Sequence, residues 1–250
     1  MTPSLNNLLA VIDKLTGPEG CPWDRAQTPQ TLCDYLVEEV YELIASIRAE
    51  DAAGVEEEMG DVFFLLFFIS RLYWGKISLD RVWDKAAAKM VGRHPHVFAE
   101  ARIKDQEELI ATWERIKKNE QGKDGSSGPF DSLPADLPPL LKAYRINSKA
   151  ARTGFTWTDT HGVEDKLREE WQEWKDALAR GDQCEMEEEF GDYLFALTEY
   201  ARRQKIKPNT ALDKANHKFL RRFREMEGLA GGEMSGLSME EKEELWRRTG

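Results

Sequence analysis

The segment Glu38-Glu39-Val40-Tyr41-Glu42, followed by Glu58-Met59-Gly60-Asp61, is the most informative part of this 250-residue chain, because its acidic pattern occurs twice. The second copy is Glu169-Glu170-Trp171-Gln172-Glu173, followed by Glu189-Phe190-Gly191-Asp192, and it lies 131 positions further along. In both copies 20 positions separate the first Glu from the last. Random surface charge has no reason to keep this spacing twice, so the pattern predicts an internally duplicated chain.

Each acidic segment falls on a predicted helix. Apolar residues recur at helical spacing from Leu32 to Ile47, and Glu39 and Glu42 lie at the rim of that apolar stripe. Residues three or four positions apart share one face of a helix, so carboxylates at this spacing lie side by side. Two anions ~4 Å apart repel by about 4 kcal/mol at an effective dielectric constant of about 20. Two facing helices with such groups need a compensating cation, and a divalent metal is the simplest one.

Helical patterns dominate the chain and no convincing strand alternation occurs, so the predicted fold class is all-α. Helices are predicted at 32–47, 55–73, 79–91 and 106–118 in the first half, and at 140–151, 163–179, 184–203 and 211–226 in the second. The second of these is apolar all round from Val62 to Ile69, which is typical of a helix at the centre of a bundle or at an oligomer interface. A Gly/Ser/Pro-rich stretch separates the halves. The predicted domains are therefore 1–118 and 140–250, joined by a linker at 119–139.

The chemistry of the acidic residues limits which metal ions the site can bind. Solvated helix faces are the alternative reading of any one acidic cluster, but the duplication favours a metal site. Ferritin-like di-iron bundles need Glu-x-x-His steps, whereas the corresponding partners here are Glu42, Asp61, Glu173 and Asp192. Ligation by carboxylate oxygens alone suits Mg²⁺ or Mn²⁺. Because Mg²⁺ usually completes its ligand shell with substrate phosphates, the pattern predicts a polyphosphate substrate.

Basic residues at positions i, i+4 and i+8 form a stripe on one predicted helix in each half. The two stripes consist of Lys85, Lys89 and Arg93, and of Lys214, Lys218 and Arg222. Such a stripe alone can simply keep a helix soluble. Paired with an acidic cluster in both halves, it favours phosphate binding, since Arg clamps phosphate oxygens with two hydrogen bonds and Lys supplies a point charge.

The overall composition excludes several classes of protein. A net charge of −11 argues against a nucleic-acid binder and against binding to an anionic membrane surface. The cysteines, Cys21, Cys33 and Cys184, show neither zinc-site spacing nor an even count. The longest apolar run, Val62–Ile69, spans 8 residues, far below the roughly 20 needed to cross a bilayer. No signal peptide is evident at the N-terminus. We therefore expect a soluble, cytoplasmic protein.

With these features in place, the chain resembles the MazG family of nucleoside triphosphate pyrophosphohydrolases, in its two-domain form, over nearly its whole length. The motifs that carry the resemblance are Gly20–Asp24, Glu38–Glu42, Glu58–Asp61, Arg93–Phe98, Gly154–Trp157, Glu169–Glu173, Glu189–Asp192 and Lys214–Phe223. The resemblance implies tandem four-helix units of the all-α NTP pyrophosphatase fold that form a homodimer. It also implies Mg²⁺-dependent cleavage of NTP or dNTP to the monophosphate and pyrophosphate.

The resemblance also implies roles for individual residues. The implied Mg²⁺ ligands are Glu170, Glu173, Glu189 and Asp192, with Glu39, Glu42, Glu58 and Asp61 as their first-half counterparts. Glu169 is the candidate to orient or deprotonate the attacking water. Lys166, Lys218 and Arg222 are the implied phosphate contacts, and Trp246 is an aromatic residue on the nucleotide side. Further substrate contacts are expected at Lys214, Asn216, Lys89 and Arg93.

The two halves are not equivalent, because Lys166 aligns with Tyr35 and Asn216 aligns with Ala87. The first half thus keeps the acids but lacks two polar partners. We predict that the C-terminal site carries most of the turnover and that the N-terminal half serves dimerisation or weaker activity.

Two other functions stay open at the level of sequence. One is a narrow pyrophosphatase that acts on a single dNTP or on a phosphoribosyl nucleotide. The other is a non-catalytic helical regulator that binds nucleotides or proteins. A kinase or ATPase with a phosphate-binding loop is not supported, because no GxxxxGK[ST] motif is present.

Overall fold

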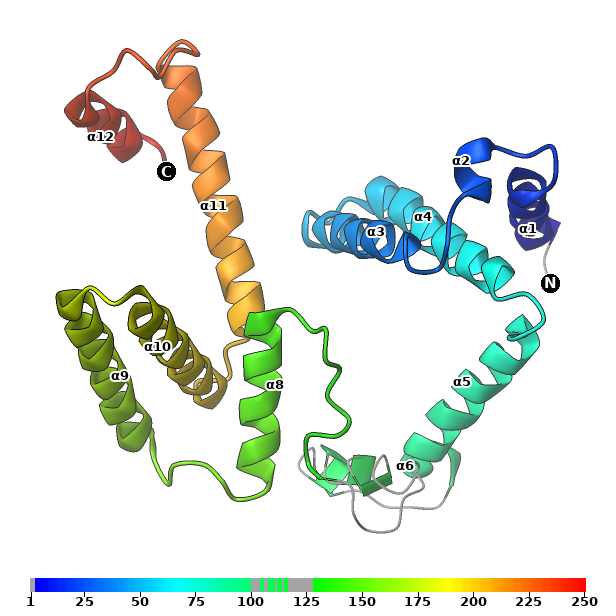
Figure 1. Cartoon of the computed structure of the whole chain (residues 1–250), viewed down its shortest axis with the longest axis horizontal. Helices are drawn as coiled ribbons and strands as arrows, with labels where there is room; N and C mark the ends of the chain where they lie inside the picture. The colour runs from blue at the N-terminus through cyan, green and yellow to red at the C-terminus, as the bar shows by residue number, and fades with distance from the viewer. Residues whose placement is uncertain (1–2, 100–103, 106–107, 111, 114, 117–127) are drawn as a thin grey trace. The chain divides into compact units, whose positions relative to one another are not determined.

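The computed structural model describes residues 3–99, 104–105, 108–110, 112–113, 115–116 and 128–250. The chain divides into two compact units, residues 1–122 and 123–250. Both units are built from helices (Figure 1). Within the described ranges, the only extended pairing is an isolated bridge between Trp74 and Ile77. The predicted all-α fold class is confirmed.

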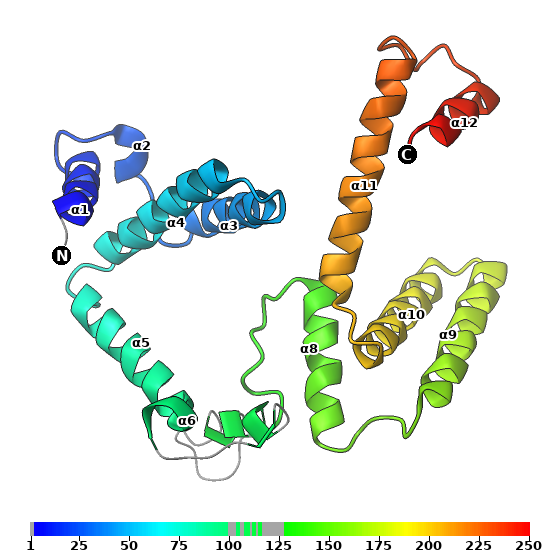
Figure 2. The ribbon, with the colours of Figure 1, turned by 180° about the vertical axis from the view of Figure 1, so that it is seen from behind.

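The first unit centres on a hairpin of two long helices. Its helices are α1 (Pro3–Thr16), α2 (Pro22–Arg25), α3 (Leu32–Arg48), α4 (Ala52–Leu72), α5 (Leu79–Arg93) and α6 (Pro95–Phe98). Helices α3 and α4 lie side by side, and α1 packs against α4 (Figures 1 and 2). The core consists of Ile12, Leu32, Leu65, Phe67 and Phe68. This core fixes the hairpin that carries the first acidic cluster.

The second unit repeats the hairpin. Its helices are α8 (Pro139–Arg152), α9 (Thr160–Arg180), α10 (Gln183–Arg203), α11 (Pro208–Leu229) and α12 (Met239–Arg248). Helices α9 and α10 pack against each other, and α8 packs on α10. Asn147 of α8 donates a hydrogen bond of 2.8 Å to the buried Thr198 hydroxyl of α10. Since an unpaired amide would be costly at a buried site, this bond fixes how α8 docks on α10.

The same kind of turn joins the two helices of each hairpin. Gly181 ends α9 in the left-handed region at φ 75°, and Asp182 then caps α10 by accepting hydrogen bonds from two backbone N–H groups. In the first unit Glu50 occupies the same region at φ 56°, and Asp51 caps α4. A left-handed residue followed by an Asp cap ends one helix and starts the next, which folds the acidic segments against each other.

Most predicted helices are present with slightly different ends. Helices α1, α2, α6 and α12 were not predicted from the sequence. The helix predicted at 106–118 and the linker predicted at 119–139 fall partly outside the described residues. On α4, Leu65, Phe67 and Phe68 are buried, whereas Phe63 and Leu66 remain largely exposed. Among the described residues of the first unit, nothing covers one side of this apolar helix completely. Across the described ranges, none of the helices is both long and apolar enough to cross a membrane.

Candidate metal and phosphate site

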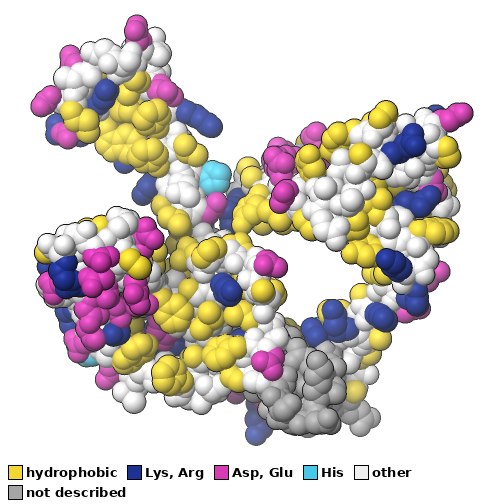
Figure 3. Space-filling view, in the orientation of Figure 1, with side chains coloured by type: hydrophobic (Ala, Val, Ile, Leu, Met, Phe, Trp, Pro, Cys, Tyr) yellow, Lys and Arg dark blue, Asp and Glu magenta, His cyan; other side chains and the backbone are white. Residues whose placement is uncertain are grey.

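The second acidic cluster forms between α9 and α10. Carboxylate oxygens of Glu170 and Glu173 on α9 and of Glu189 on α10 lie within 4.8 Å of one another. Glu170 is buried, Glu189 is half-buried and Glu173 is exposed. Figure 3 shows acidic side chains gathered on this hairpin. The fourth expected ligand, Asp192, lies outside this group of three. The pKa of Glu189 is raised, first by partial burial, then by the charge of Glu173 and then by the charge of Asp192, so Asp192 is close to the cluster.

Lys166 is the cation of this cluster. Its Nζ lies 2.8 Å from Glu169 Oε1 and 2.8 Å from Glu170 Oε1. Lys166 precedes these acids by three and four positions, which places all three side chains on one face of α9. Its hydrogen bonds to Glu169 and then to Glu170 raise the pKa of Lys166 above the ordinary lysine value. The ammonium is therefore charged throughout the physiological range.

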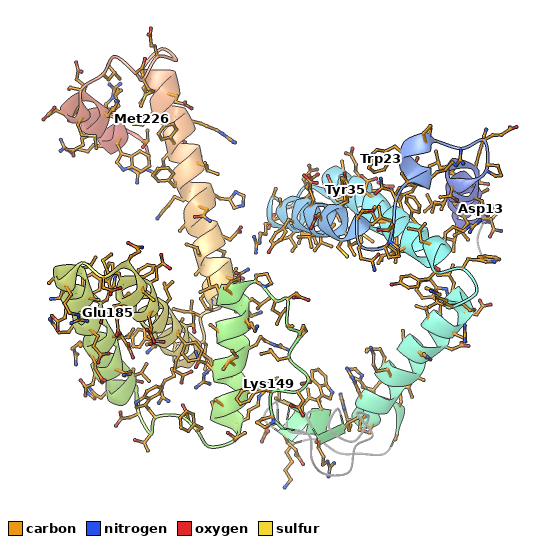
Figure 4. All side chains as sticks on the ribbon, viewed as in Figure 1. Asp13, Trp23, Tyr35, Lys149, Glu185 and Met226 are labelled. Atoms are coloured by element: carbon orange, nitrogen blue, oxygen red, sulfur yellow. The ribbon has the colours of Figure 1, made fainter. Side chains whose placement is uncertain are left out.

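The first acidic cluster has the same form but lacks this lysine. Carboxylate oxygens of Glu39, Glu58 and Asp61 lie within 4.8 Å of one another, while Glu42 lies outside that group. Tyr35 stands at the position of Lys166, with its ring edge-on to Trp23 at 5.6 Å between centroids (Figure 4). Among the described residues, the charges that act on the pKa of Glu39 and Glu58 are those of neighbouring acids, with no lysine or arginine among them.

Partial burial and the crowding of carboxylates raise the pKa of two glutamates in the first cluster. Partial burial, and then the charge of Asp61, raises the pKa of Glu39; partial burial, and then the charge of Glu42, raises the pKa of Glu58. Glu39 and Glu58 therefore hold a proton more tightly than isolated glutamates would.

This titration predicts a pH dependence of stability. A carboxylate whose pKa is higher in the folded than in the unfolded state contributes stability at low pH that is lost as pH rises through the folded value. We therefore expect the thermal midpoint of the protein in EDTA to gain a stabilising contribution from Glu39 and Glu58 as pH falls through their raised pKa values towards 4.5. The Glu39→Gln/Glu58→Gln variant should lack that contribution. Equal pH slopes for both proteins in EDTA would contradict the prediction.

Helix α11 holds the second basic stripe. The Arg222 guanidinium donates to the Thr249 hydroxyl at 3.1 Å and to the Trp246 carbonyl at 2.9 Å, and its Cζ lies 4.0 Å from the centroid of the Trp246 ring. Arg222 thus anchors α12 on α11. Lys214, Asn216 and Lys218 are exposed on the same helix.

A cavity of about 660 Å³ lies between α11 and α12. Its lining includes Phe219, Phe223, Met226 and Trp246, and it is almost wholly apolar (Figures 3 and 4). Trp246 was expected on the nucleotide side, and the structure places its ring at this cavity. An aromatic wall of this kind can stack on a flat ring system.

The structure does not bring all the predicted residues together. The described neighbours of α11 are α8, α10 and α12, and no described ion pair or hydrogen bond joins Lys218 or Arg222 to the acids of α9 and α10. On α5, Lys89 is exposed and Arg93 is half-buried at the helix end. The acids and Lys166 form one local site, while the α11 cations lie on a separate element.

The donor set fits a hard divalent cation. Each group of three offers only carboxylate oxygens, on two helices, at separations that one ion can bridge. Neither group includes a histidine or cysteine. The sequence predicted these acids, but not that Lys166 binds two carboxylates of this cluster, those of Glu169 and Glu170. The spacing of Lys166 from Glu169 and Glu170 could have shown it, because i+3 and i+4 pairs meet on a helix.

Two helical hairpins that each gather three carboxylates define an all-α protein with a duplicated acidic site suited to divalent cations. Comparison with known proteins identifies the family. The sequence model of the MazG nucleotide pyrophosphohydrolase domain matches residues 27–98 and 160–226, which cover both hairpins. The chain belongs to the MazG family, and with it to the hydrolases that act on acid anhydrides.

Curated relatives support this membership. The chain is 38% identical to a nucleoside triphosphate pyrophosphohydrolase of Escherichia coli K12, over 98% of this chain and 96% of the relative. It is also 38% identical to the nucleoside triphosphate pyrophosphohydrolase/pyrophosphatase MazG of Thermotoga maritima, over 96% of this chain and 93% of the relative. A Bacillus subtilis protein, the uncharacterized protein YabN, is 40% identical over 95% of this chain and 50% of its own length. The resemblance stated from the sequence motifs is confirmed.

Proposed function

We propose that this protein hydrolyses nucleoside and deoxynucleoside triphosphates to the monophosphate and pyrophosphate with Mg²⁺ or Mn²⁺, and so maintains the nucleotide pool. The observation that carries the proposal is the group of carboxylates from Glu170, Glu173 and Glu189 within 4.8 Å, next to the Lys166 ammonium. A polyphosphate chain needs positive charge around its oxygens, and this cluster can collect that charge at one point. The names of the relatives point to the same substrates.

Each residue of the C-terminal cluster has a task in this proposal. Glu170, Glu173 and Glu189 would hold the divalent ion, with Asp192 beside them. When bound, that ion polarises the phosphoryl oxygens. Glu169 is more than half exposed next to the cluster, where its carboxylate can orient the attacking water or accept its proton. Lys166 would neutralise charge that develops on the phosphates.

The remaining phosphate contacts are proposed to come from α11 in a homodimer. Lys218 and Arg222 contact no acid of the cluster in the described single chain, so another copy is the simplest way to bring them to it. Large apolar side chains are exposed on the hairpin of α9 and α10, namely Trp171, Leu178, Phe190, Leu194, Phe195 and Leu197. A second copy would cover this apolar surface. Lys214, Asn216 and Trp246 would then contact the nucleotide.

We further propose that the two halves work unequally. The C-terminal domain, 140–250, would carry most of the turnover because it has Lys166 and Asn216, where the N-terminal domain, 1–118, has Tyr35 and Ala87. In the N-terminal half, Glu39, Glu42, Glu58 and Asp61 would hold a divalent ion, and Lys89 and Arg93 would contribute weaker phosphate contacts. The proposed compartment is the cytoplasm, with neither nucleic acid nor membrane as a partner, in keeping with the net charge of −11 and three free cysteines.

The function is tested by measuring pyrophosphate release from the four common NTPs and four common dNTPs with Mg²⁺. We expect release from all eight, and loss of release when EDTA removes the metal. Release from one dNTP alone would indicate a pyrophosphatase of narrow specificity instead. Activity confined to a phosphoribosyl nucleotide would indicate the same. Tight nucleotide binding without any release would indicate a non-catalytic regulator instead.

A further inference from the structure

We propose that Lys166 is an exchangeable counter-ion of the C-terminal acidic cluster. In the absence of metal its ammonium holds Glu169 and Glu170 together, and a divalent ion that binds Glu170 displaces it towards the substrate phosphates. The second step rests on the proposed function, whereas the first concerns only the protein and the metal.

The contacts of Glu170 carry the first step. Its side chain is only 8% exposed, yet it accepts a 2.8 Å charge-assisted hydrogen bond from Lys166 and also belongs to the group of three carboxylates. A buried carboxylate without a partner is costly, so the ammonium stabilises the cluster in its metal-free form. Glu170 is therefore shared between two cations that would compete for it.

The second step follows from charge and flexibility. An ammonium at 2.8 Å from a carboxylate oxygen repels a divalent ion that approaches the same carboxylate, so binding of the ion favours displacement of the ammonium. Lys166 can move, because its side chain is one-third exposed and has a flexible four-carbon stem. Its other partner, Glu169, is more than half exposed, so its side chain can move with the lysine. The released ammonium stays on the rim of the cluster, where a phosphate bound there would meet it.

The N-terminal cluster provides the internal comparison. At the corresponding position Tyr35 turns its ring towards Trp23 and offers no ammonium to Glu39, Glu58 or Asp61. A divalent ion entering this cluster has no lysine to displace. We therefore expect the N-terminal cluster to bind a divalent ion more tightly in the absence of nucleotide, although it lacks the cation that the reaction needs.

The experiment is a titration of the full-length protein with Mn²⁺ alone, in which electron paramagnetic resonance reports free Mn²⁺. Lys166→Met keeps the apolar stem and removes the charge, and we expect it to tighten Mn²⁺ binding at one class of site by about tenfold. Lys175→Met, which changes an exposed lysine on the same helix, should leave both the affinity and the activity unchanged. Lys166→Arg should bind Mn²⁺ as the unaltered protein does.

The reciprocal variant tests the same idea in the other half. Tyr35→Lys should weaken Mn²⁺ binding at the N-terminal cluster by about tenfold. Unchanged or weaker binding by Lys166→Met would overturn the counter-ion role, as would the absence of any Mn²⁺ binding by the unaltered protein. In turnover assays Lys166→Met should raise KM and lower kcat together.

The two ideas fail differently. An unaltered protein that releases no pyrophosphate while Lys166→Met tightens Mn²⁺ binding would refute the proposed function and keep the counter-ion. An active protein whose Mn²⁺ affinity does not respond to Lys166→Met would refute the counter-ion alone.

Discussion

Replacement of Glu170 by glutamine is expected to lower kcat for pyrophosphate release by about 100- to 1000-fold, the scale typical of losing one group that stabilises the transition state electrostatically. Glu170 is the buried member of the C-terminal cluster and contacts both the proposed metal position and Lys166. The amide keeps the shape of the side chain but supplies no negative charge. Divalent-ion binding and lysine placement should therefore both fail. The rate is measured as pyrophosphate released at saturating nucleotide and Mg²⁺.

Its matched control is the same change in the other half. Glu39 is the counterpart of Glu170, and we expect Glu39→Gln to change the rate by no more than about threefold, which corresponds to less than 1 kcal/mol. The same asymmetry should hold for Glu173→Gln against Glu42→Gln. Equal loss from both members of a pair would refute the claim that the C-terminal site carries most of the turnover. Circular dichroism should show that each variant remains helical.

Replacement of Phe68 by alanine is expected to lower the free energy of unfolding of the first unit by about 3–5 kcal/mol. Phe68 is 1% exposed and lies in the core with Ile12, Leu32 and Leu65. The change removes most of a ring at a site where α1, α3 and α4 meet, so it loses buried apolar area and leaves a cavity. Urea unfolding followed by circular dichroism measures the effect.

The control for this change is Phe155, which is 83% exposed in the loop between α8 and α9. Phe155→Ala removes the same atoms from solvent rather than from a core, and should alter the free energy of unfolding by no more than about 0.5 kcal/mol. If the two variants unfolded at the same urea concentration, the first core would not depend on Phe68.

Much of the fold could be predicted because it is local. The apolar spacing from Leu32 to Ile47 predicted α3, and the helices predicted at 163–179 and 184–203 correspond to α9 and α10. Helix α12 was missed because its amphipathic pattern is short. It does begin with a capping box at Ser238 and Glu241, which was the available signal. Helix α1 also carries a local signal, because Leu5, Leu8, Leu9 and Ile12 recur at helical spacing.

The site could be predicted only in part. All eight acids lie on the two hairpins as expected, yet each group of three leaves out one of them, Glu42 in the first unit and Asp192 in the second. Which acid falls outside depends on how far one helix slides and rotates against its neighbour. Side-chain packing between the helices sets that geometry.

By itself, the sequence determined that the chain is helical, duplicated and acidic at two matched places, because helix periodicity and carboxylate spacing act over a few residues. Only the tertiary structure decided that Glu170 is buried and that Lys218 and Arg222 stand apart from it. These facts depend on contacts between helices far apart in the chain. The burial of Glu170 and its separation from the α11 cations arise from those contacts, and no local pattern encodes them.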